Sequence, residues 1–389
     1  SERPENRVVL LERQARVGRK LLATGNGRCN LTNRKLSLEN YHGEDSDFCE
    51  CALMRFDQER TLQFFRGLGL LTVAEPSGRV YPVSDSANSV VDVLRLALAQ
   101  RENVELRAGC EVQLLRKKNE KFEAVLPDGS VQADCAIVCA GGCAGGKLGG
   151  TELGYRLLES FGHKRTKLYP ALVQLKTDTT YVRALKGVRC EVRAVLKTDG
   201  GRTERAGELQ FTDYGVSGPV IFELSRAAAQ GGLLLLDLLP DVPAGELTQL
   251  LQARQAALPQ LALEDLLTGM LHNRLGRTVL RRCGLSLEAP CGSLPADRLP
   301  EICRTVKTFA LPVLGPMGFD AAQVTAGGIR TDEFSAQTLE SRLCPGLYAA
   351  GEVLDIDGDC GGYNLQWAWS SGRLAGQLLN GRERHASHS

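Results

Sequence analysis

The two ends of the chain share one sequence pattern, and the middle has a different one. Near the start, the aliphatic run 7–11 ends at Glu12 and is followed by a glycine-rich loop from Gly18 to Asn33. Near the end, the run 347–350 leads into a second glycine-rich loop and then into a helical pattern from Tyr363. Short aliphatic runs of this kind are typical of buried strands in parallel sheets. The pattern predicts one α/β domain assembled from both chain ends.

The middle of the chain changes character twice. From about Ala171 to Leu238 it consists of short alternating β runs with paired glycines at the turns. From about Glu246 to Cys283 the spacing of apolar residues is helical, with an interruption at Pro259. We therefore expect a β-rich insert and a helical insert between the two halves of the α/β domain.

The charge balance and the cysteines narrow the class of protein. Lys and Arg number 47 and Asp and Glu 46, so the net charge is +1, which argues against a protein that binds mainly nucleic-acid phosphates. The longest aliphatic runs, such as Leu233–Leu236, are far shorter than the roughly 20 residues of a membrane-spanning helix. The 13 cysteines are an odd number spread over the chain, which is typical of a reducing cytosol. We expect a cytoplasmic protein without nucleic-acid or membrane partners.

Glu12 is a candidate nucleotide contact. A carboxylate at the tip of the second parallel strand is what a dinucleotide-binding fold uses to bind the adenosine ribose. Such a carboxylate follows a G-x-G-x-x-G turn by about 20 residues. Counting back from Glu12 passes Ser1, so we expect this turn to lie outside the chain. An ordinary strand end with a solvated carboxylate is the alternative, and the local pattern alone favours it.

The loop from Gly18 to Asn33 combines small residues with positive charge. Its glycines allow the backbone to approach a ligand closely, and its basic side chains can bind phosphates. These residues are Gly18, Gly25 and Gly27, with Arg19, Lys20 and Arg28. A solvated flexible loop is the alternative. Asn and Thr side chains that can form hydrogen bonds alternate with the glycines, which favours a binding loop.

A third segment joins an expected strand to small residues. The run Cys135–Cys139 leads into Ala140, Gly141 and Gly142, over which a bound ligand can pass. The cysteines 135, 139 and 143 are spaced four apart, unlike the usual ligand spacings of zinc and iron–sulfur sites. We expect these thiols to pack in the core and assign no metal site.

A fourth segment opens the last helix. Ala349–Glu352 has the pattern of a strand end, and a glycine-rich turn precedes the helix expected from Tyr363. Free N–H groups at a helix start bind partial negative charge, and can stabilise an electron-rich ring.

Hydrolytic chemistry has little support, because the sequence contains neither a G-x-S-x-G elbow nor an H-E-x-x-H helix.

Four ordered segments resemble a known family. Leu21–Asn33, Gly207–Pro219, Val324–Ile329, and Ala350–Asp355 with Gly361–Ala368 are similar to blocks of the bacterial HI0933-like (BaiN-like, aminoacetone oxidase-like) flavoproteins. The match runs from Val8 to Gly376, and four ordered blocks are far more specific than one glycine motif. Cys139 stands where the family usually has Thr, a change of one small residue for another.

The resemblance implies a fold and a cofactor. The fold is α/β, an FAD-binding Rossmann-like domain of the two-dinucleotide-binding-domains type with inserted β-barrel-like and small helical domains. The expected boundaries are 1–168 and 325–389 for the FAD-binding domain, 169–240 and 302–324 for the barrel-like insert, and 241–301 for the helical insert. On this basis the first strand, its glycine-rich turn and most of the first helix are expected to be missing from the chain.

The resemblance also implies which residues lie along FAD. Glu12 would bind the adenosine ribose and the backbone of Val112 the adenine. The segment 140–142 would lie near the adenosine half, Gly351 and Glu352 near the pyrophosphate and ribityl chain, and 362–366 near the flavin ring. The full implied set is Glu12, Gly18, Arg19, Lys20, Gly25, Asn26, Gly27, Arg28, Cys29, Asn30, Val112, Ala140, Gly141, Gly142, Gly351, Glu352, Gly361, Gly362, Tyr363, Asn364, Leu365 and Gln366.

The leading functional hypothesis is an FAD-dependent oxidoreductase that transfers hydride through flavin N5. The resemblance implies either reduction of a conjugated C=C bond in a hydrophobic, steroid-like or bile-acid-like enone, or oxidation of a small amine such as aminoacetone. An RNA-modifying flavoprotein and a non-catalytic truncated homologue are the alternatives from other classes. No catalytic residue is assigned, and the oligomeric state is open. The expected partner is a small-molecule substrate. NADH or NADPH would bind only transiently.

Overall fold

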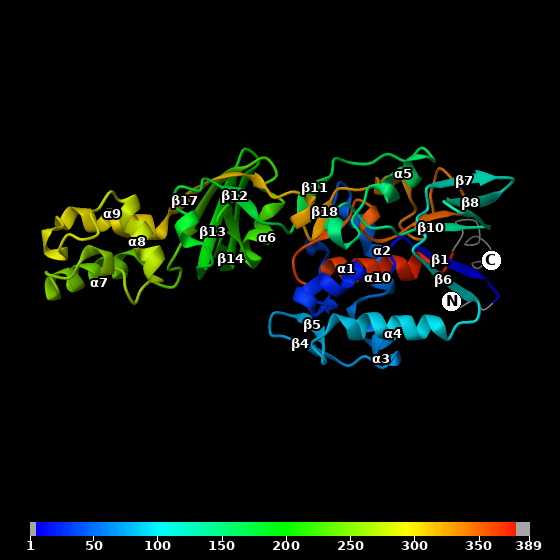
Figure 1. Ribbon diagram of the computed structural model, residues 1–389, viewed down its shortest axis with the longest axis horizontal. Helices are drawn as coiled ribbons and strands as arrows, with labels where there is room; N and C mark the ends of the chain where they lie inside the picture. Colours follow the sequence, from blue (N-terminus) through cyan, green and yellow to red (C-terminus); the bar gives the residue numbers. More distant parts are fainter. Residues whose placement is uncertain (1–4, 379–389) are drawn as a thin grey trace, which may run out of the picture. The chain divides into compact units, whose positions relative to one another are not determined.

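The computed structural model describes residues 5–378, apart from the side chain of Ala296. The chain divides into two compact units (Figure 1). The first joins Ser1–Tyr169 to Ala322–Ser389, and the second is Pro170–Ala321. One unit therefore contains both ends of the chain. The finer boundaries of the inserts stay a prediction.

The first unit is built from short strands and helices. Its strands are β1 (Val8–Glu12), β2 (Thr32–Asn33), β3 (Tyr41–His42), β4 (Thr72–Ala74), β5 (Arg79–Pro82), β6 (Val104–Ala108), β7 (Leu114–Lys118), β8 (Lys121–Leu126), β9 (Gly129–Ala133), β10 (Ala136–Val138), β18 (Val324–Ala326), β19 (Leu347–Ala349) and β20 (Asp357–Gly358). Its α-helices are α1 (Arg19–Ala23), α2 (Glu50–Arg55), α3 (Gln58–Gly67), α4 (Ala87–Ala99), α5 (Leu153–Glu159) and α10 (Tyr363–Ala375). β11 (Tyr169–Ala171) crosses the boundary between the units in the sequence.

Two parallel strand pairs join distant parts of the first unit. β1 pairs with β6 in the register Val8↔Val104, and β10 pairs with β19 in the register Ala136↔Leu347. Parallel pairs need long crossover connections, which the intervening helices and antiparallel strands supply. The predicted Rossmann-like α/β fold is confirmed in this unit.

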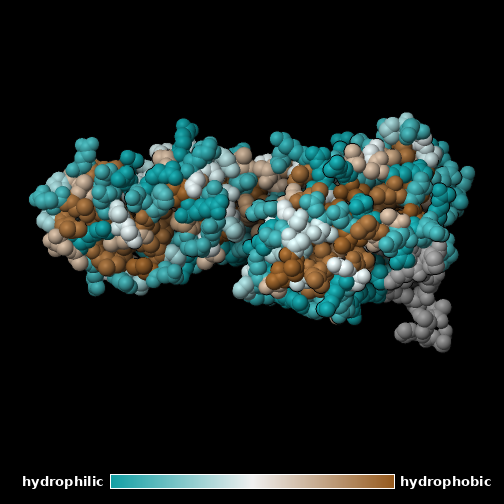
Figure 2. All heavy atoms as spheres, turned by 60° about the horizontal axis from the view of Figure 1, so that its bottom comes forward, coloured by the Kyte–Doolittle hydropathy of each residue, from teal (hydrophilic) through white to brown (hydrophobic). Residues whose placement is uncertain are grey.

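Two expectations about strands are wrong. We expected a fully buried strand at 7–11, but Val8 and Leu10 in β1 are 37% and 38% exposed. Apolar groups reach the surface of this unit elsewhere too, as the brown spheres on the right of Figure 2 show. The apolar run at 131–138 favours one strand, but the structure has two, β9 and β10, because β9 pairs with β8 and β10 pairs with β19.

The expected core position of Cys139 is also wrong, because Cys139 follows β10 as an exposed residue. Cys135 and Cys143 are partly exposed and lie against the core of the first unit. Among residues 5–378, no group of three or more His, Cys, Asp and Glu side chains is arranged to hold a metal ion.

Helix α10 is the central helix of the first unit (Figure 1) and packs against α2 and the segment Gly351–Val353. Its buried residues recur with helical spacing at Tyr363, Gln366, Trp367, Ser370, Ser371, Leu374 and Ala375. Trp367 is 1% exposed, and its indole N–H donates to the Gly351 carbonyl at 3.1 Å. The core therefore fixes the position of the α10 N-terminus.

The second unit contains a closed barrel with the strand order β12-β15-β14-β13-β16-β17, which confirms the predicted barrel-like insert. The strands are β12 (Leu175–Thr177), β13 (Arg189–Thr198), β14 (Gly201–Phe211), β15 (Gly215–Ser217), β16 (Gly232–Asp237) and β17 (Phe309–Pro316). Alternate residues of β13 (Val192, Ala194 and Leu196) are buried in the core, as the period of a strand requires. The helices of this unit are α6 (Pro219–Ser225), α7 (Ala244–Ala257), α8 (Asn273–Arg282) and α9 (Leu299–Lys307).

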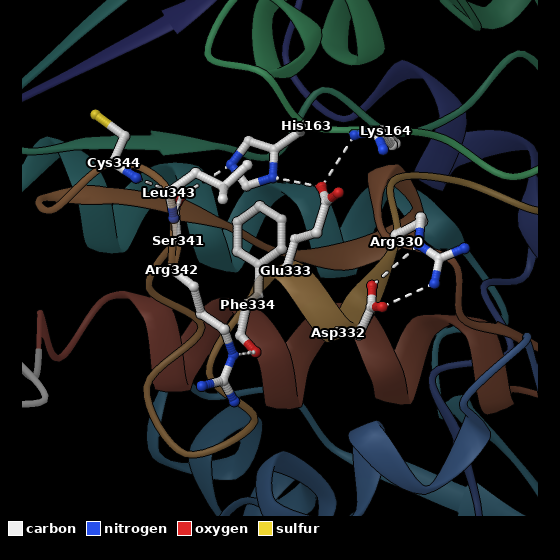
Figure 3. Close-up of polar contacts among 10 residues, drawn as sticks. All are labelled: His163, Lys164, Arg330, Asp332, Glu333, Phe334, Ser341, Arg342, Leu343 and Cys344. Carbon is white, nitrogen blue, oxygen red and sulfur yellow. Dashed lines mark hydrogen bonds and ion pairs between the residues drawn. The ribbon is translucent and has the colours of Figure 1, made fainter.

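A buried polar cluster connects the segment after α5 to residues 330–344 (Figure 3). His163 Nδ1 lies 2.9 Å from Glu333 Oε2, and Nε2 lies 2.8 Å from Ser341 Oγ. Ser341 Oγ already accepts from the backbone N–H groups of Leu343 and Cys344. The Ser341 hydroxyl therefore donates to Nε2, and the imidazole is the neutral Nδ1–H form. Burial lowers the pKa of His163, although the Glu333 carboxylate opposes this effect.

No helix among the described residues is both long enough and apolar enough to cross a membrane.

Candidate functional site

Helix α10 begins after Gly362, which no other residue can replace without strain. Gly362 is the N-cap and has φ 100°. A Cβ atom there would lie 2.5 Å from the Thr32 carbonyl oxygen and 2.9 Å from Asn30 Oδ1. The first helical bond runs from Gln366 N to the Gly362 carbonyl, so the three preceding N–H groups have no acceptor within the helix. This helix start has a partial positive charge.

Asn30 brings an unsatisfied acceptor to the same place. The residue is 9% exposed, and its Oδ1 atom has no hydrogen-bond partner among the described residues. An unpaired buried polar atom costs about 1–3 kcal/mol. An unpaired acceptor beside the α10 N-terminus is typical of a binding site in which a donor group of the ligand forms the missing hydrogen bond.

The loop from Thr24 to Asn30 has an unusual backbone. Gly25, Asn26, Gly27 and Cys29 all have left-handed conformations, with φ 57°, 57°, 86° and 60°. A Cβ at Gly25 would lie 2.8 Å from the Asn30 backbone nitrogen, so the loop closes tightly there. Burial raises the pKa of the Cys29 thiol to about 11, so this thiol is protonated at neutral pH and is a structural group.

The guanidinium of Arg28 has partners within the protein. It forms ion pairs with Asp85 and with Glu75, and it lies 3.9 Å above the centroid of the Tyr81 ring. Two carboxylates therefore neutralise Arg28, which weakens the expectation that this side chain supplies charge for a phosphate.

Two predicted residues from opposite chain ends, Lys20 and Glu352, are in direct contact. Lys20 Nζ lies 2.6 Å from Glu352 Oε2, and Glu352 Oε1 accepts from the Thr325 backbone N–H at 2.8 Å. A Cβ at Gly142 would lie 2.5 Å from Thr325 Oγ1 and 2.9 Å from Glu352 Oε1. The structure therefore brings Lys20, Gly142 and Glu352 together.

Two predicted residues at the start of α10 turn their side chains into the protein. Asn364 accepts from Gly358 N at 2.8 Å and donates back to the Gly358 carbonyl at 2.7 Å. Gln366 is fully buried, accepts from Thr32 Oγ1 at 2.6 Å and donates to the Phe56 carbonyl at 2.9 Å. These side chains hold the loop and the helix in place, so a ligand contact here would come from the backbone.

The remaining predicted contacts lie on other elements. Glu12 Oε1 accepts from Gln14 N at 2.7 Å, and Arg19 Nη1 donates to Gln14 Oε1 at 2.9 Å, so Gln14 connects these two residues. Val112 precedes β7 and lies against the core of the first unit, and Leu365 lies against a smaller core that includes Cys29.

Sequence reasoning missed a His–Asp pair beside the loop that leads to α10. His42 Nε2 lies 2.7 Å from Asp359 Oδ1, and both side chains are about one third exposed, at 33% and 30%. The pair forms because β3 and β20 are antiparallel neighbours, with His42 opposite Asp357. Such a pairing between distant segments has no local signal in the sequence, although His42 is one of only five histidines in the chain.

A comparison with family models gives a match over residues 1–378 to the family described as "HI0933-like protein Rossmann domain". The chain belongs to this family. Membership confirms the predicted family and fold, and with them the predicted class of flavin-dependent oxidoreductases.

Two curated relatives of this HI0933-like chain differ in their substrates. A 3-dehydro-bile acid delta(4,6)-reductase of Clostridium scindens is 38% identical over 95% of this chain and 92% of that protein. A ribosomal RNA dihydrouridine synthase of Escherichia coli is 32% identical over 96% of this chain and 92% of that protein. The second match means that the sequence argument against a nucleic-acid partner is not supported.

Among solved structures, the match to E. coli quinol fumarate reductase covers 100% of this chain and 67% of the reductase chain, with 16% identity and a TM-score of 0.47. This likeness is too weak to inform the function.

Proposed function

We propose that the chain is an FAD-dependent reductase of C=C bonds conjugated to a carbonyl group, and that its substrates are steroid-like enones. The observation that carries the proposal is the 38% identity to a 3-dehydro-bile acid delta(4,6)-reductase over nearly the whole of both chains. The identity to the ribosomal RNA dihydrouridine synthase is lower, at 32%.

The geometry of the α10 N-terminus supports a flavin ring at that position. The ring of a flavin has an N–H donor at N3 and carbonyl acceptors, and the site offers the complementary groups. Asn30 Oδ1 is an acceptor without a partner, and the helix start offers N–H donors with a partial positive charge. The backbone at Gly27 and Gly351 is open, because a Cβ at either position would meet nothing within 4 Å.

Each part of the chain then has a defined task. When bound, FAD would supply hydride from N5 of its reduced ring. The α10 N-terminus would stabilise negative charge on the ring, and Asn30 would orient it. The Lys20–Glu352 ion pair would hold the two glycine-rich segments at a fixed separation, so that the cofactor chain can lie along them. A proton must also reach the substrate carbon next to the carbonyl, and the described residues suggest no single donor for it.

A ribosomal RNA substrate is the second candidate, and it is favoured by a specific observation. Two relatives, 32% and 28% identical, are named ribosomal RNA dihydrouridine synthase. Dihydrouridine differs from uridine by a reduced C=C bond conjugated to a ring carbonyl. Both candidates therefore use the same bond chemistry, and the substrate alone separates them. Oxidation of a small amine remains a prediction, as does transient use of NADH or NADPH.

Product analysis distinguishes these candidates. The FAD-loaded protein is reduced chemically without oxygen and incubated with a 3-oxo-4-ene steroid or with a ribosomal RNA transcript. The masses of the products are then measured by mass spectrometry. The proposal expects a steroid product with two added hydrogen atoms and an unchanged RNA. Reduced uridine in the RNA with an unchanged steroid would favour the second candidate instead.

A further inference from the structure

Arg79 lies beside the glycines at which α10 begins. A Cβ atom on Gly361 would lie 3.6 Å from Arg79 Nε and 3.2 Å from Asn33 Nδ2. Gly361 directly precedes the N-cap Gly362, where a Cβ would lie 2.9 Å from the unpartnered Asn30 Oδ1. The guanidinium group of Arg79 is therefore next to the candidate position of the flavin ring.

Strand β5 holds Arg79 between the two glycine-rich segments. Arg79 is opposite Asn33 in the antiparallel pair of β5 and β2, and Tyr81, two residues further on, is on the same side of the strand. A Cβ on Gly25 would lie 3.2 Å from Tyr81 Cε1. One side of β5 therefore contacts the first segment through Tyr81 and the second segment, at Gly361, through Arg79.

The positive charge of Arg79 has no carboxylate partner. Among residues 5–378 its guanidinium forms no ion pair, and its polar contact is the Cys360 thiol, with Sγ 4.0 Å from Nη2. A thiol is a weak acceptor, and a guanidinium has five N–H donors. Arg79 is partly exposed, so its donors are accessible to a ligand.

The acidic groups of this region contact other side chains. Glu75 forms an ion pair with Arg28, and Asp359 Oδ1 lies 2.7 Å from His42 Nε2. Arg79 can therefore bind negative charge on a ligand.

Reduction of a C=C bond conjugated to a carbonyl group places negative charge on the carbonyl oxygen. Hydride, which reduced flavin supplies in the function proposed above, adds to the β-carbon. The C=C electron pair then joins the α-carbon to the carbonyl carbon, and the C=O pair moves onto the oxygen as an enolate. A proton from water adds to the α-carbon and the C=O bond re-forms, so the substrate gains two hydrogen atoms and the flavin loses two electrons. Charged donors fixed beside such an oxygen stabilise the transition state.

We propose that Arg79 is a catalytic residue, whose guanidinium binds the substrate carbonyl oxygen and stabilises the enolate. The proposal rests on the proposed function only for its bond chemistry, because a steroid-like enone and a uridine ring share the conjugated carbonyl. Arginine is not deprotonated in proteins, so Arg79 holds the oxygen and does not supply the proton.

The first test measures flavin oxidation by the substrate. FAD-loaded variants are reduced without oxygen and mixed with a 3-oxo-4-ene steroid at several concentrations. We expect Arg79→Gln to lower the limiting rate at least about 100-fold, because loss of an oxyanion donor has effects of this size, and to change the half-saturating concentration much less. The matched control is Arg66→Gln, an exposed arginine of α3, which should react as the wild type does.

The second test does not depend on turnover. A phenolate, like an enolate, has negative charge on an oxygen joined to unsaturated carbon, and it gives a long-wavelength absorbance band when it lies against oxidised flavin. The protein with oxidised FAD is titrated with 4-cyanophenol at a pH at which the free phenol is ionised. We expect the wild type and Arg66→Gln to bind it, and Arg79→Gln to bind it at least about tenfold more weakly. Arg79→Lys keeps the charge but not the planar donors, should have an intermediate affinity, and serves if Arg79→Gln does not fold.

The two tests separate this proposal from the proposed substrate. A wild type that binds 4-cyanophenol through Arg79 but does not reduce the steroid would support the role of Arg79 and contradict the steroid substrate. The role of Arg79 is overturned if the wild type does not bind the phenolate, or if Arg79→Gln binds it equally well. It is also overturned if Arg79→Gln raises the half-saturating steroid concentration and keeps the limiting rate, because Arg79 would then bind substrate without stabilising the enolate.

Discussion

Lys20 and Glu352 form an ion pair of 2.6 Å between residues that are 332 positions apart in the chain. Their side chains are 33% and 20% exposed. The pair joins α1, which lies within the first glycine-rich segment, to the short helical turn Gly351–Val353, which follows β19 and precedes the second glycine-rich segment. Together with the hydrogen bond from Thr32 to Gln366, it brings the two predicted cofactor segments from opposite chain ends into contact.

Removing this pair should weaken FAD binding more than it weakens the fold. In Glu352→Gln the neutral amide loses the charge partner of Lys20. Because partly exposed pairs contribute about 0.5–1 kcal/mol, we expect the dissociation constant for FAD to rise about two- to fivefold. Quenching of flavin fluorescence on binding measures it. Asp92→Asn is the matched control, since it removes the exposed pair with Arg95 on α4 and should leave the dissociation constant unchanged.

Two glycines of the same helix region should respond in opposite ways to alanine. Gly362→Ala places a Cβ 2.5 Å from the Thr32 carbonyl in a left-handed backbone, and should cost about 2 kcal/mol or more in unfolding free energy. Gly372→Ala lies within α10, where a Cβ meets nothing within 4 Å, and should stabilise by about 0.5–1 kcal/mol. Urea unfolding followed by tryptophan fluorescence compares them. Equal effects of the two changes would be inconsistent with this account of the α10 N-terminus.

Asn30→Leu should separate binding from stability. The substitution removes a buried acceptor that has no partner, so the FAD-free protein should unfold with an unchanged or higher free energy, by up to about 1 kcal/mol. In the FAD-loaded protein the substitution would remove the proposed hydrogen bond to the flavin ring, so the affinity for FAD should fall. Thermal unfolding with and without FAD measures both. A variant that is destabilised without FAD and binds FAD normally would show that Asn30 has only a structural role.

His163 should make the stability of the first unit depend on pH. Burial lowers its pKa in the folded state, so between the folded value and the unfolded value of about 6.5 the unfolded chain binds more protons. The stabilisation is therefore complete above pH of about 6.5 and is lost as the pH falls towards the folded value. Both tryptophans, Trp367 and Trp369, lie in the first unit, so their fluorescence reports its thermal unfolding.

The control for this pH effect is a second histidine. His163→Gln should flatten the pH dependence below about 6.5. His272→Asn should not, because His272 is exposed at the start of α8 and Asn is also a good N-cap. If the two variants keep the same pH profile as the wild type, His163 is not the group responsible.

The sequence predicted the parts of the structure that have a local signal. Apolar residues at positions 87, 90, 91, 94 and 98 recur with helical spacing, and the structure has α4 at Ala87–Ala99. The glycine-rich turn predicted the start of α10, and Gly362 shows why, since only glycine has the space and the backbone angle there. The aliphatic runs 7–11 and 347–350 predicted strands of a parallel sheet, and β1 and β19 do pair in parallel, with β6 and β10.

The parts that the sequence could not predict depend on contacts between distant segments. The two carboxylates that neutralise Arg28 come from residues 75 and 85, and no spacing rule connects them to residue 28. The resemblance implies that Gln366 lies near the flavin ring, yet its side chain is held by Thr32 and Phe56 inside the unit. The exposure of β1 depends on which elements cover the sheet, and an aliphatic run does not encode that.

The most direct test of the central claim is a rapid-mixing experiment without oxygen. The FAD-loaded protein is reduced, mixed with a 3-oxo-4-ene steroid, and followed through the visible absorbance of oxidised flavin. The account predicts that the absorbance returns at a rate that rises with steroid concentration and saturates, and that a saturated 3-oxo steroid has no effect. Reduced flavin that the enone leaves unchanged, but that oxygen reoxidises rapidly after reduction by a small amine, would contradict the account and indicate an oxidase.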